Sequence, residues 1–134
     1  MEDMKLLGID YGRSKIGLAV SDGKIAEPMG VLRIKSVEEG MRKLSNIIRK
    51  ENITKVVLGI SEGVMGKESK AFGKSLENAV KIPVLLQDET LSTKSALELS
   101  IDANIKRRRR REMEDAFSAA IILQGFIDSN SFRS

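Results

Sequence analysis

KLLGIDYGRSKIGLAVSD, residues 5–22, is the stretch of sequence that decides the fold. Two short apolar runs, Leu6–Ile9 and Ile16–Val20, flank the glycine-containing segment Tyr11–Ser14. Short apolar runs bounded by turn residues are typical of strands rather than helices, so we predict two strands joined by a tight hairpin. Asp10 then lies at the end of the first strand. A carboxylate at the edge of a buried sheet is costly unless a cation meets it, which makes Asp10 the first candidate for chemistry.

The composition narrows the kinds of chemistry that this chain can perform. Its 134 residues include no cysteine and no histidine, and the formal net charge is +4. Disulfides and thiol nucleophiles are therefore excluded, and acid–base steps fall to carboxylates, Lys, Tyr or metal-bound water. The length predicts one domain, residues 1–134. The mixed charge of Met1–Lys5 indicates no signal peptide, and no apolar run approaches the roughly 20 residues of a membrane span. We expect a cytoplasmic protein that does not bind membranes.

The pattern of apolar residues after the first hairpin predicts a third strand and then alternating helices and strands. Ser36 and Glu39 have the spacing of a capping box at the start of a helix. The expected strands are Leu6–Ile9, Ile16–Val20, Pro28–Ile34, Lys55–Ile60 and Ile82–Gln87, and the expected helices are Ser36–Lys50, Lys67–Val80, Thr93–Asn104 and Glu112–Asp128. An antiparallel meander followed by βα units gives an α/β fold with a mixed sheet.

Several acids are expected at one edge of this sheet. Three strands that we expect to be parallel to each other are each followed by acids: the first by Asp10, the fourth by Glu62, and the fifth by Asp88 and Glu89. Ligands gather at the carboxyl ends of such strands. Asp115 joins them if the last helix packs across that edge; otherwise it is an acid in the first turn of a helix, stabilised by the helix dipole. Crowded carboxylates without histidine or cysteine favour Mg²⁺ or Mn²⁺. Such ions near a basic surface point to phosphodiester hydrolysis.

Basic residues occur near these acids in the sequence. Arg13 and Lys15 lie in the first hairpin, and Lys106–Arg111 are six consecutive basic residues. A run of charge is often only a solvated loop or helix face. The alternative is contact with the phosphates of a nucleic acid, which would give a salt-dependent and sequence-independent contribution to binding.

Four segments together resemble a known family. GIDYGRSKIGLAVSD (8–22), VVLGI (56–60), DETLST (88–93) and EDAFSAAIIL (114–123) are similar to the YqgF family, the RuvX-like members of the ribonuclease-H-like nuclease superfamily. The resemblance implies a five-stranded mixed sheet flanked by helices. It also implies a nuclease, described either as a Holliday junction resolvase or as the enzyme that matures the 5′ end of precursor 16S ribosomal RNA.

The resemblance also assigns the site residues. It places the family's acids on Asp10, on the pair Asp88 and Glu89, and on Asp115. The departure is the loop after the fourth expected strand, where the family usually has a Gly-Leu-Pro motif and an Asn. This chain instead reads GISEGVMG, residues 59–66, with Glu62 as an additional acid.

The sequence thus leads to one main hypothesis and two alternatives. In the main hypothesis, Asp10, Glu89 and Asp115 hold a divalent metal, Asp88 belongs to the catalytic group or replaces Glu89, and basic side chains bind the nucleic acid: Arg13, Lys15, Arg107, Arg108, Arg109, Arg110 and Arg111. The first alternative is a nucleic-acid-binding assembly factor with little catalysis. The second is an actin-like phosphotransferase, which the glycines of the first hairpin allow but the short chain opposes. RNA and DNA substrates, and a monomer and a homodimer, remain open.

Overall fold

The computed structural model describes residues 4–60, 64–88 and 107–130. Its strands are β1 (Leu6–Tyr11), β2 (Lys15–Ser21), β3 (Ala26–Arg33), β4 (Lys55–Ile60) and β5 (Val84–Asp88). Its helices are α1 (Val37–Lys50), α2 (Val64–Val80) and α4 (Arg107–Asn130). The helix expected at 93–104 lies outside the described residues, as do Glu62, Glu89 and Lys106.

The five strands form one mixed sheet in the order β3-β2-β1-β4-β5. β1 pairs antiparallel with β2, and β2 with β3, while β4 is parallel to β1 and β5 is parallel to β4. The expected meander followed by a parallel half is therefore confirmed. Because β1, β4 and β5 run in the same direction, Tyr11, Ile60 and Asp88 end their strands at the same edge of the sheet.

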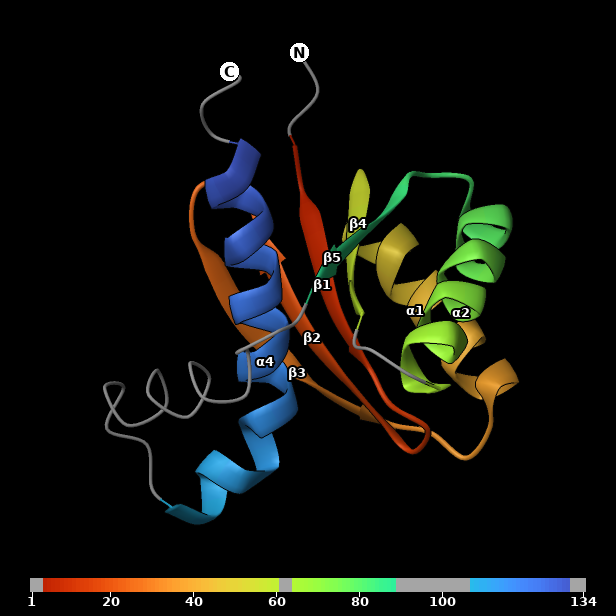
Figure 1. Cartoon of the computed structure of the whole chain (residues 1–134), viewed down its shortest axis with the longest axis horizontal. Coiled ribbons are helices and arrows are strands. Elements are labelled where there is room, and N and C mark those ends of the chain that lie inside the picture. Colours follow the sequence, from red (N-terminus) through yellow and green to blue (C-terminus); the bar gives the residue numbers. More distant parts are fainter. Residues whose placement is uncertain (1–3, 61–63, 89–106, 131–134) are drawn as a thin grey trace.

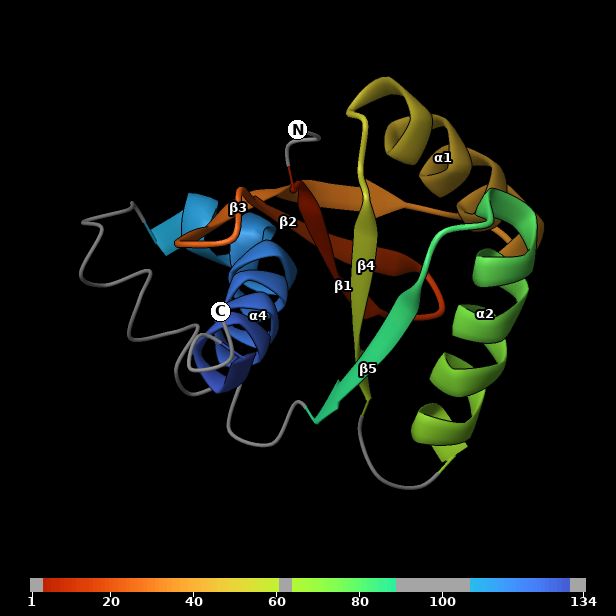
Figure 2. The same ribbon diagram turned by 90° about the horizontal axis from the view of Figure 1, so that it is seen from above.

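Helices cover both faces of the sheet: α1 and α2 lie on one face and α4 on the other (Figures 1 and 2). The period of two in a strand divides β1 between two cores. Leu7, Ile9 and Tyr11 belong to the core beneath α1 and α2, while Leu6 belongs to the core beneath α4. In the part of the chain that the structure describes, no helix is long and apolar enough to cross a membrane.

The strands β3 and β5 begin at other residues than the sequence predicts, and a proline lies near the start of each. β5 begins at Val84 rather than Ile82, because Pro83 cannot donate a ladder hydrogen bond; its carbonyl accepts one from the Val56 amide at 2.9 Å. β3 begins at Ala26, before Pro28, and pairs with β2 through a register shift between Leu18 and Ala19. Proline is tolerated there because β3 is at the edge of the sheet.

Two helices begin earlier than predicted. α2 begins at Val64 instead of Lys67, and α4 at Arg107 instead of Glu112. Arginine is a good helix former, so the basic run extends the last helix toward its N-terminus. Asp115 is consequently about two turns inside α4, and the interpretation of it as a first-turn acid stabilised by the helix dipole is wrong.

Candidate active site

Asp10 lies on the face of the sheet that α4 covers. A β-carbon added to Gly8 would meet the Leu123 Cβ of α4 at 2.8 Å, so position 8 faces that helix. Alternate residues of a strand share a face, which places Asp10 on the same side. Its backbone pairs with Gly17 on β2 and with Gly59 on β4. Asp10 is therefore flanked on both sides by residues that have no side chain.

Asp115 reaches this region because α4 approaches β2 unusually closely. A β-carbon at Gly17 would collide with the backbone carbonyl of Asp115. Glycine at this position lets the helix backbone rest directly on the strand. Since Gly17 is also the partner of Asp10 in the β1–β2 ladder, the same contact brings Asp115 above Asp10.

The two carboxylates line a common cavity of about 170 Å³. Its walls are Asp10, Tyr11, Gly12, Arg13, Ser14, Lys15 and Asp115. The Lys15 ammonium lies 3.5 Å from Asp115 Oδ2, and the Asp115 side chain is 31% exposed. The cavity thus contains two acids, with a lysine beside Asp115, and is open to solvent at the edge of the sheet. We call it the acid cavity.

The remaining predicted acids are only partly located. The backbone of Asp88 pairs with Ile60 at the end of β5, so Asp10 and Asp88 are at the same edge of the sheet, as expected. Glu62 and Glu89 lie outside the described residues. Among the residues that are described, no group of three acids is close enough to hold a metal ion. The described donor set consists of the two carboxylates of the acid cavity, which are oxygen ligands of the kind that Mg²⁺ and Mn²⁺ prefer.

Arg13 extends from the hairpin toward helix α2. Its Nε donates to Glu68 Oε2 at 3.1 Å and its Nη2 to Glu68 Oε1 at 2.8 Å. These hydrogen bonds lower the pKa of the Glu68 carboxyl. Burial raises the pKa of the Tyr11 phenol above its ordinary value, and the Glu68 carboxylate raises it further. Tyr11 is therefore a neutral hydrogen-bond donor at neutral pH, beside a fixed guanidinium.

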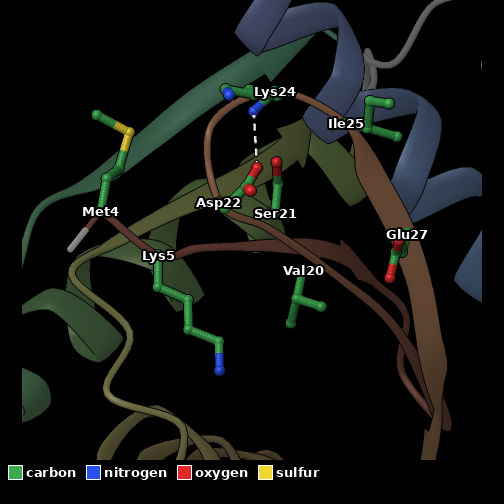
Figure 3. A pocket seen from close by; sticks show the side chains of 8 residues that line it. All are labelled: Met4, Lys5, Val20, Ser21, Asp22, Lys24, Ile25 and Glu27. Carbon is green, nitrogen blue, oxygen red and sulfur yellow. Dashed lines mark hydrogen bonds between the residues drawn. The ribbon is translucent and has the colours of Figure 1, made fainter.

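A larger cavity than the acid cavity lies at the opposite end of the sheet, away from Asp10 and Asp115. It has a volume of about 710 Å³ and is lined by Met4, Lys5, Val20, Ser21, Asp22, Lys24, Ile25 and Glu27 (Figure 3). Two of its charged side chains have local partners: Lys5 pairs with Glu51 at 3.1 Å, and Asp22 accepts from the Lys24 amide. Size alone does not identify the site here, because the acid chemistry is concentrated in the smaller cavity.

Comparison with known proteins decides the family. A family model described as "RuvX: Holliday junction resolvase" matches residues 4–129. The chain belongs to the RuvX family. A protein of Bacillus pumilus named "Putative pre-16S rRNA nuclease" is 37% identical, over 94% of this chain and 99% of its own length. A protein of the same name from Bacillus subtilis is 36% identical, with the same coverage. The family is described as a resolvase and these relatives are named as nucleases, so the prediction that this chain is a nuclease is confirmed.

Solved structures confirm the fold predicted for a RuvX member. RuvC of Thermus thermophilus, in a complex with a Holliday junction substrate, has a TM-score of 0.67 at 13% identity and covers 95% of this chain and 96% of its own. The fowlpox virus resolvase in complex with Holliday junction DNA gives 0.65 at 13% identity, covering 94% and 98%. At these identities the likeness is one of fold, and it supports the ribonuclease-H-like arrangement of the sheet.

Sequence reasoning did not find two features of this RuvX chain. Glu68 was not singled out, because the separation of 55 residues from Arg13 has no local signature. The contact of Gly17 with Asp115 was also missed, although the glycine itself stood out in the first hairpin. An apolar helix with small residues, such as Ala116 and Ala119, opposite a glycine-containing strand is the one signal that could have suggested so close an approach.

Proposed function

We propose that this chain is a divalent-metal-dependent nuclease that hydrolyses phosphodiester bonds of structured RNA, in 5′-end processing of precursor 16S ribosomal RNA. The observation that carries this proposal is the acid cavity, in which Asp10 and Asp115 come together between the cations Arg13 and Lys15. The names of the relatives supply the substrate. Ribosomal RNA precursors are made in the bacterial cytoplasm, so we also propose a cytoplasmic location.

Asp10 and Asp115 fit a divalent metal because their oxygens are hard ligands and the chain contains no histidine or cysteine. We propose Glu89 as the third ligand and Asp88 as a further member of the catalytic group. When bound, the metal would supply a nucleophilic hydroxide at neutral pH and stabilise the leaving oxygen. The reaction would need no imidazole.

The side chains around the acids would bind and orient the substrate. Lys15, which pairs with Asp115, can bind a phosphate beside the acids. Arg13 has N–H groups beyond the two that Glu68 occupies, and these can donate to an adjacent phosphate. Arg107, Arg108, Arg109, Arg110 and Arg111 would add attraction to the backbone that depends on salt but not on sequence.

The test is cleavage of two substrates in parallel: a precursor 16S RNA and a four-way DNA junction, each with Mg²⁺ or Mn²⁺. We expect cleavage of the RNA that EDTA abolishes. Asp10→Asn should abolish cleavage and leave binding largely intact, because it removes one charge from the metal site and no phosphate contact. Unchanged cleavage by Asp10→Asn would refute the assignment of the site.

The description of the family favours a second candidate, a Holliday junction resolvase. Symmetric resolution of a four-way junction would need two sites, hence a homodimer, whereas RNA processing is compatible with a monomer. Preferential cleavage of the junction, with a dimer in sedimentation, would select this function. Binding of both substrates without metal-dependent cleavage would instead indicate an assembly factor.

Substitutions can show whether Glu89 or Asp88 is the third metal ligand. Glu89→Gln should raise the Mn²⁺ concentration needed for half-maximal cleavage if Glu89 is a ligand, and Asp88→Asn should do so if Asp88 replaces it. Calorimetric titration of Mn²⁺ into each variant gives the same comparison without turnover. Equal Mn²⁺ affinity in both variants and the wild type would remove the pair from the metal site.

A further inference from the structure

A second cavity lies beside the acid cavity, on the other side of the first hairpin. Its volume is about 520 Å³. It is lined by Tyr11, Arg13, Lys35, Ser36, Val37, Glu68, Ala71, Phe72 and Ser75. Tyr11 and Arg13 line both cavities, so these two residues form their common wall. We call this second space the flanking cavity.

The floor of the flanking cavity is aromatic and its sides are partly apolar. The rings of Tyr11 and Phe72 are stacked with their centroids 4.4 Å apart, and both residues are buried. Val37, at the start of α1, is 49% exposed. The stacked rings form a rigid base to the cavity, and the exposed side chain of Val37 provides apolar surface that a ring-shaped ligand could cover.

The rim of the flanking cavity is polar and carries a net positive charge. Lys35 and Arg13 contribute two positive charges and Glu68 one negative charge. Glu68 holds the guanidinium of Arg13 by two hydrogen bonds, which fixes its orientation between the two cavities. A guanidinium has five N–H groups, so three remain to donate to an anion. The rim therefore suits a ligand with one phosphate.

We propose that the flanking cavity holds one nucleotide of the substrate strand, next to the nucleotide whose phosphate is cleaved at the acid cavity. The base would lie over the apolar surface near Tyr11 and Val37, and its phosphate would bind Arg13 and Lys35. A partly apolar cavity edged with cations suits an unpaired nucleotide, because its base can cover the apolar surface while its phosphate binds the cations. The volume is within the roughly 300–1,000 Å³ of small-molecule sites. This inference rests on the proposed nuclease function and specifies the part of the substrate that must be unpaired.

The common wall explains why a strand segment is expected there rather than an unrelated small molecule. Arg13 and Lys15 line the acid cavity, so a phosphate placed beside Asp10 lies near both of these cations. Arg13 also lines the flanking cavity, together with a second cation, Lys35. A continuous path of cations thus leads from the acid cavity into the flanking cavity, as a nucleic acid backbone requires.

The test uses the only tyrosine of the chain as a reporter. Incorporation of 3-fluorotyrosine gives one ¹⁹F NMR signal, from position 11. A single-stranded 12-nucleotide RNA is titrated in EDTA, which prevents cleavage. We expect the signal to shift on titration, and Lys35→Gln to weaken the RNA affinity at least threefold. Lys35→Gln should also lower the slope of log K against log salt by about 0.7, the value for one phosphate of a single strand.

Lys74→Gln is the matched control, because Lys74 is an exposed lysine of α2 that lines neither cavity. It changes the net charge equally and should leave the shift and the salt slope close to those of the wild type. Equal effects of Lys35→Gln and Lys74→Gln would overturn the proposal, since both would then act only through total charge.

Ser75→Glu provides a second, independent test. It places a carboxylate at the exposed side of the flanking cavity without changing the acid cavity. We expect a higher KM for the RNA and little change in kcat, because the reacting groups are untouched. An unchanged KM would contradict the inference. If the wild type shows no metal-dependent cleavage, the proposed function is refuted. The comparison of Lys35→Gln with Lys74→Gln in the RNA titration would still decide whether the flanking cavity binds RNA.

Discussion

The backbone carbonyl of Asp115 occupies the space that a β-carbon at Gly17 would need. Gly17 is also the direct partner of Asp10 in the antiparallel β1–β2 ladder. One glycine therefore determines how near the helix that carries the second acid can come to the strand that carries the first. The acid cavity depends on a residue that has no functional group of its own.

Gly17→Ala tests this dependence. The added methyl group has to displace α4 or distort β2, because its obstacle is backbone rather than a flexible side chain. We expect the free energy of unfolding to fall by about 1–3 kcal/mol, the usual cost of overpacking. Cleavage should fall by more than the loss of folded protein explains. Urea denaturation and metal-dependent cleavage of the precursor RNA measure the two effects.

Gly125→Ala is the matched control on the same helix. Among the residues that the structure describes, a β-carbon at position 125 would meet only Gln87 Nε2, at 3.5 Å, which is an ordinary contact. Alanine in place of a helical glycine should increase stability by about 0.5–1 kcal/mol and leave cleavage unchanged. A loss of cleavage in Gly125→Ala equal to that in Gly17→Ala would show that α4 tolerates no added methyl group, and the special role of Gly17 would be lost.

Lys15→Met separates metal binding from phosphate binding. The Lys15 ammonium is 3.5 Å from Asp115 Oδ2 and partly neutralises the acid cavity. Its removal should lower the Kd for Mn²⁺ several-fold, because the carboxylates then attract the cation without competition. The same substitution should weaken RNA binding and lower the salt slope by about 0.7–0.9, as expected when one phosphate is no longer neutralised.

Isothermal titration of Mn²⁺ without RNA measures the first effect, and fluorescence anisotropy of labelled RNA over a range of salt measures the second. Lys74→Met, with the same change of charge on an exposed site of α2, should alter neither quantity appreciably. A higher Kd for Mn²⁺ in Lys15→Met would mean that Lys15 positions Asp115 for the metal instead of competing with it.

The sequence predicts most of the fold because its signals are local. The alternation of apolar residues gives the strands, and the Ser36 cap is confirmed: Ser36 Oγ accepts from the Glu39 amide at 3.1 Å. The predicted boundaries of strands and helices are wrong where a local sequence feature overrides the hydrophobic pattern. Pro83 delays β5 and the arginine run extends α4, because a missing amide or a strong helix former acts more locally than hydrophobic periodicity.

The candidate site is predictable only in part, because some of it depends on contacts between residues far apart in the sequence. Strand direction places Asp10 and Asp88 at one edge of the sheet, so this part follows from topology. The approach of Asp115 depends on the contact between Gly17 and α4, and the Arg13–Glu68 pair joins residues far apart in the chain. Neither tertiary contact has a spacing in the sequence that would reveal it.

Replacement of all five arginines at 107–111 by glutamine tests the role of the basic run. If the run binds phosphates, the slope of log K against log salt should fall by about 0.9 for each duplex phosphate that the variant no longer neutralises. Glutamine is also a good helix former, so α4 should persist, which circular dichroism can verify. An unchanged slope would mean that the run is a solvated part of the helix.

The pair formed by Arg13 and Glu68 predicts a specific pH dependence. Hydrogen bonds from Arg13 lower the pKa of Glu68 below its ordinary value of 4.5. A lowered pKa in the folded state stabilises the fold above the unfolded pKa, and this contribution disappears as the pH falls through the folded pKa. The difference in unfolding free energy between the wild type and Arg13→Gln should therefore vanish in acid. Carboxyl ¹³C NMR should show the Glu68 pKa rising in Arg13→Gln.

Glu39 is the internal control for this measurement. Its pKa is lowered by its own hydrogen bond from Lys43 and should be the same in the wild type and in Arg13→Gln. A Glu68 pKa that is the same in both proteins would show that the pair does not persist in solution, and the fixed orientation of Arg13 would be wrong.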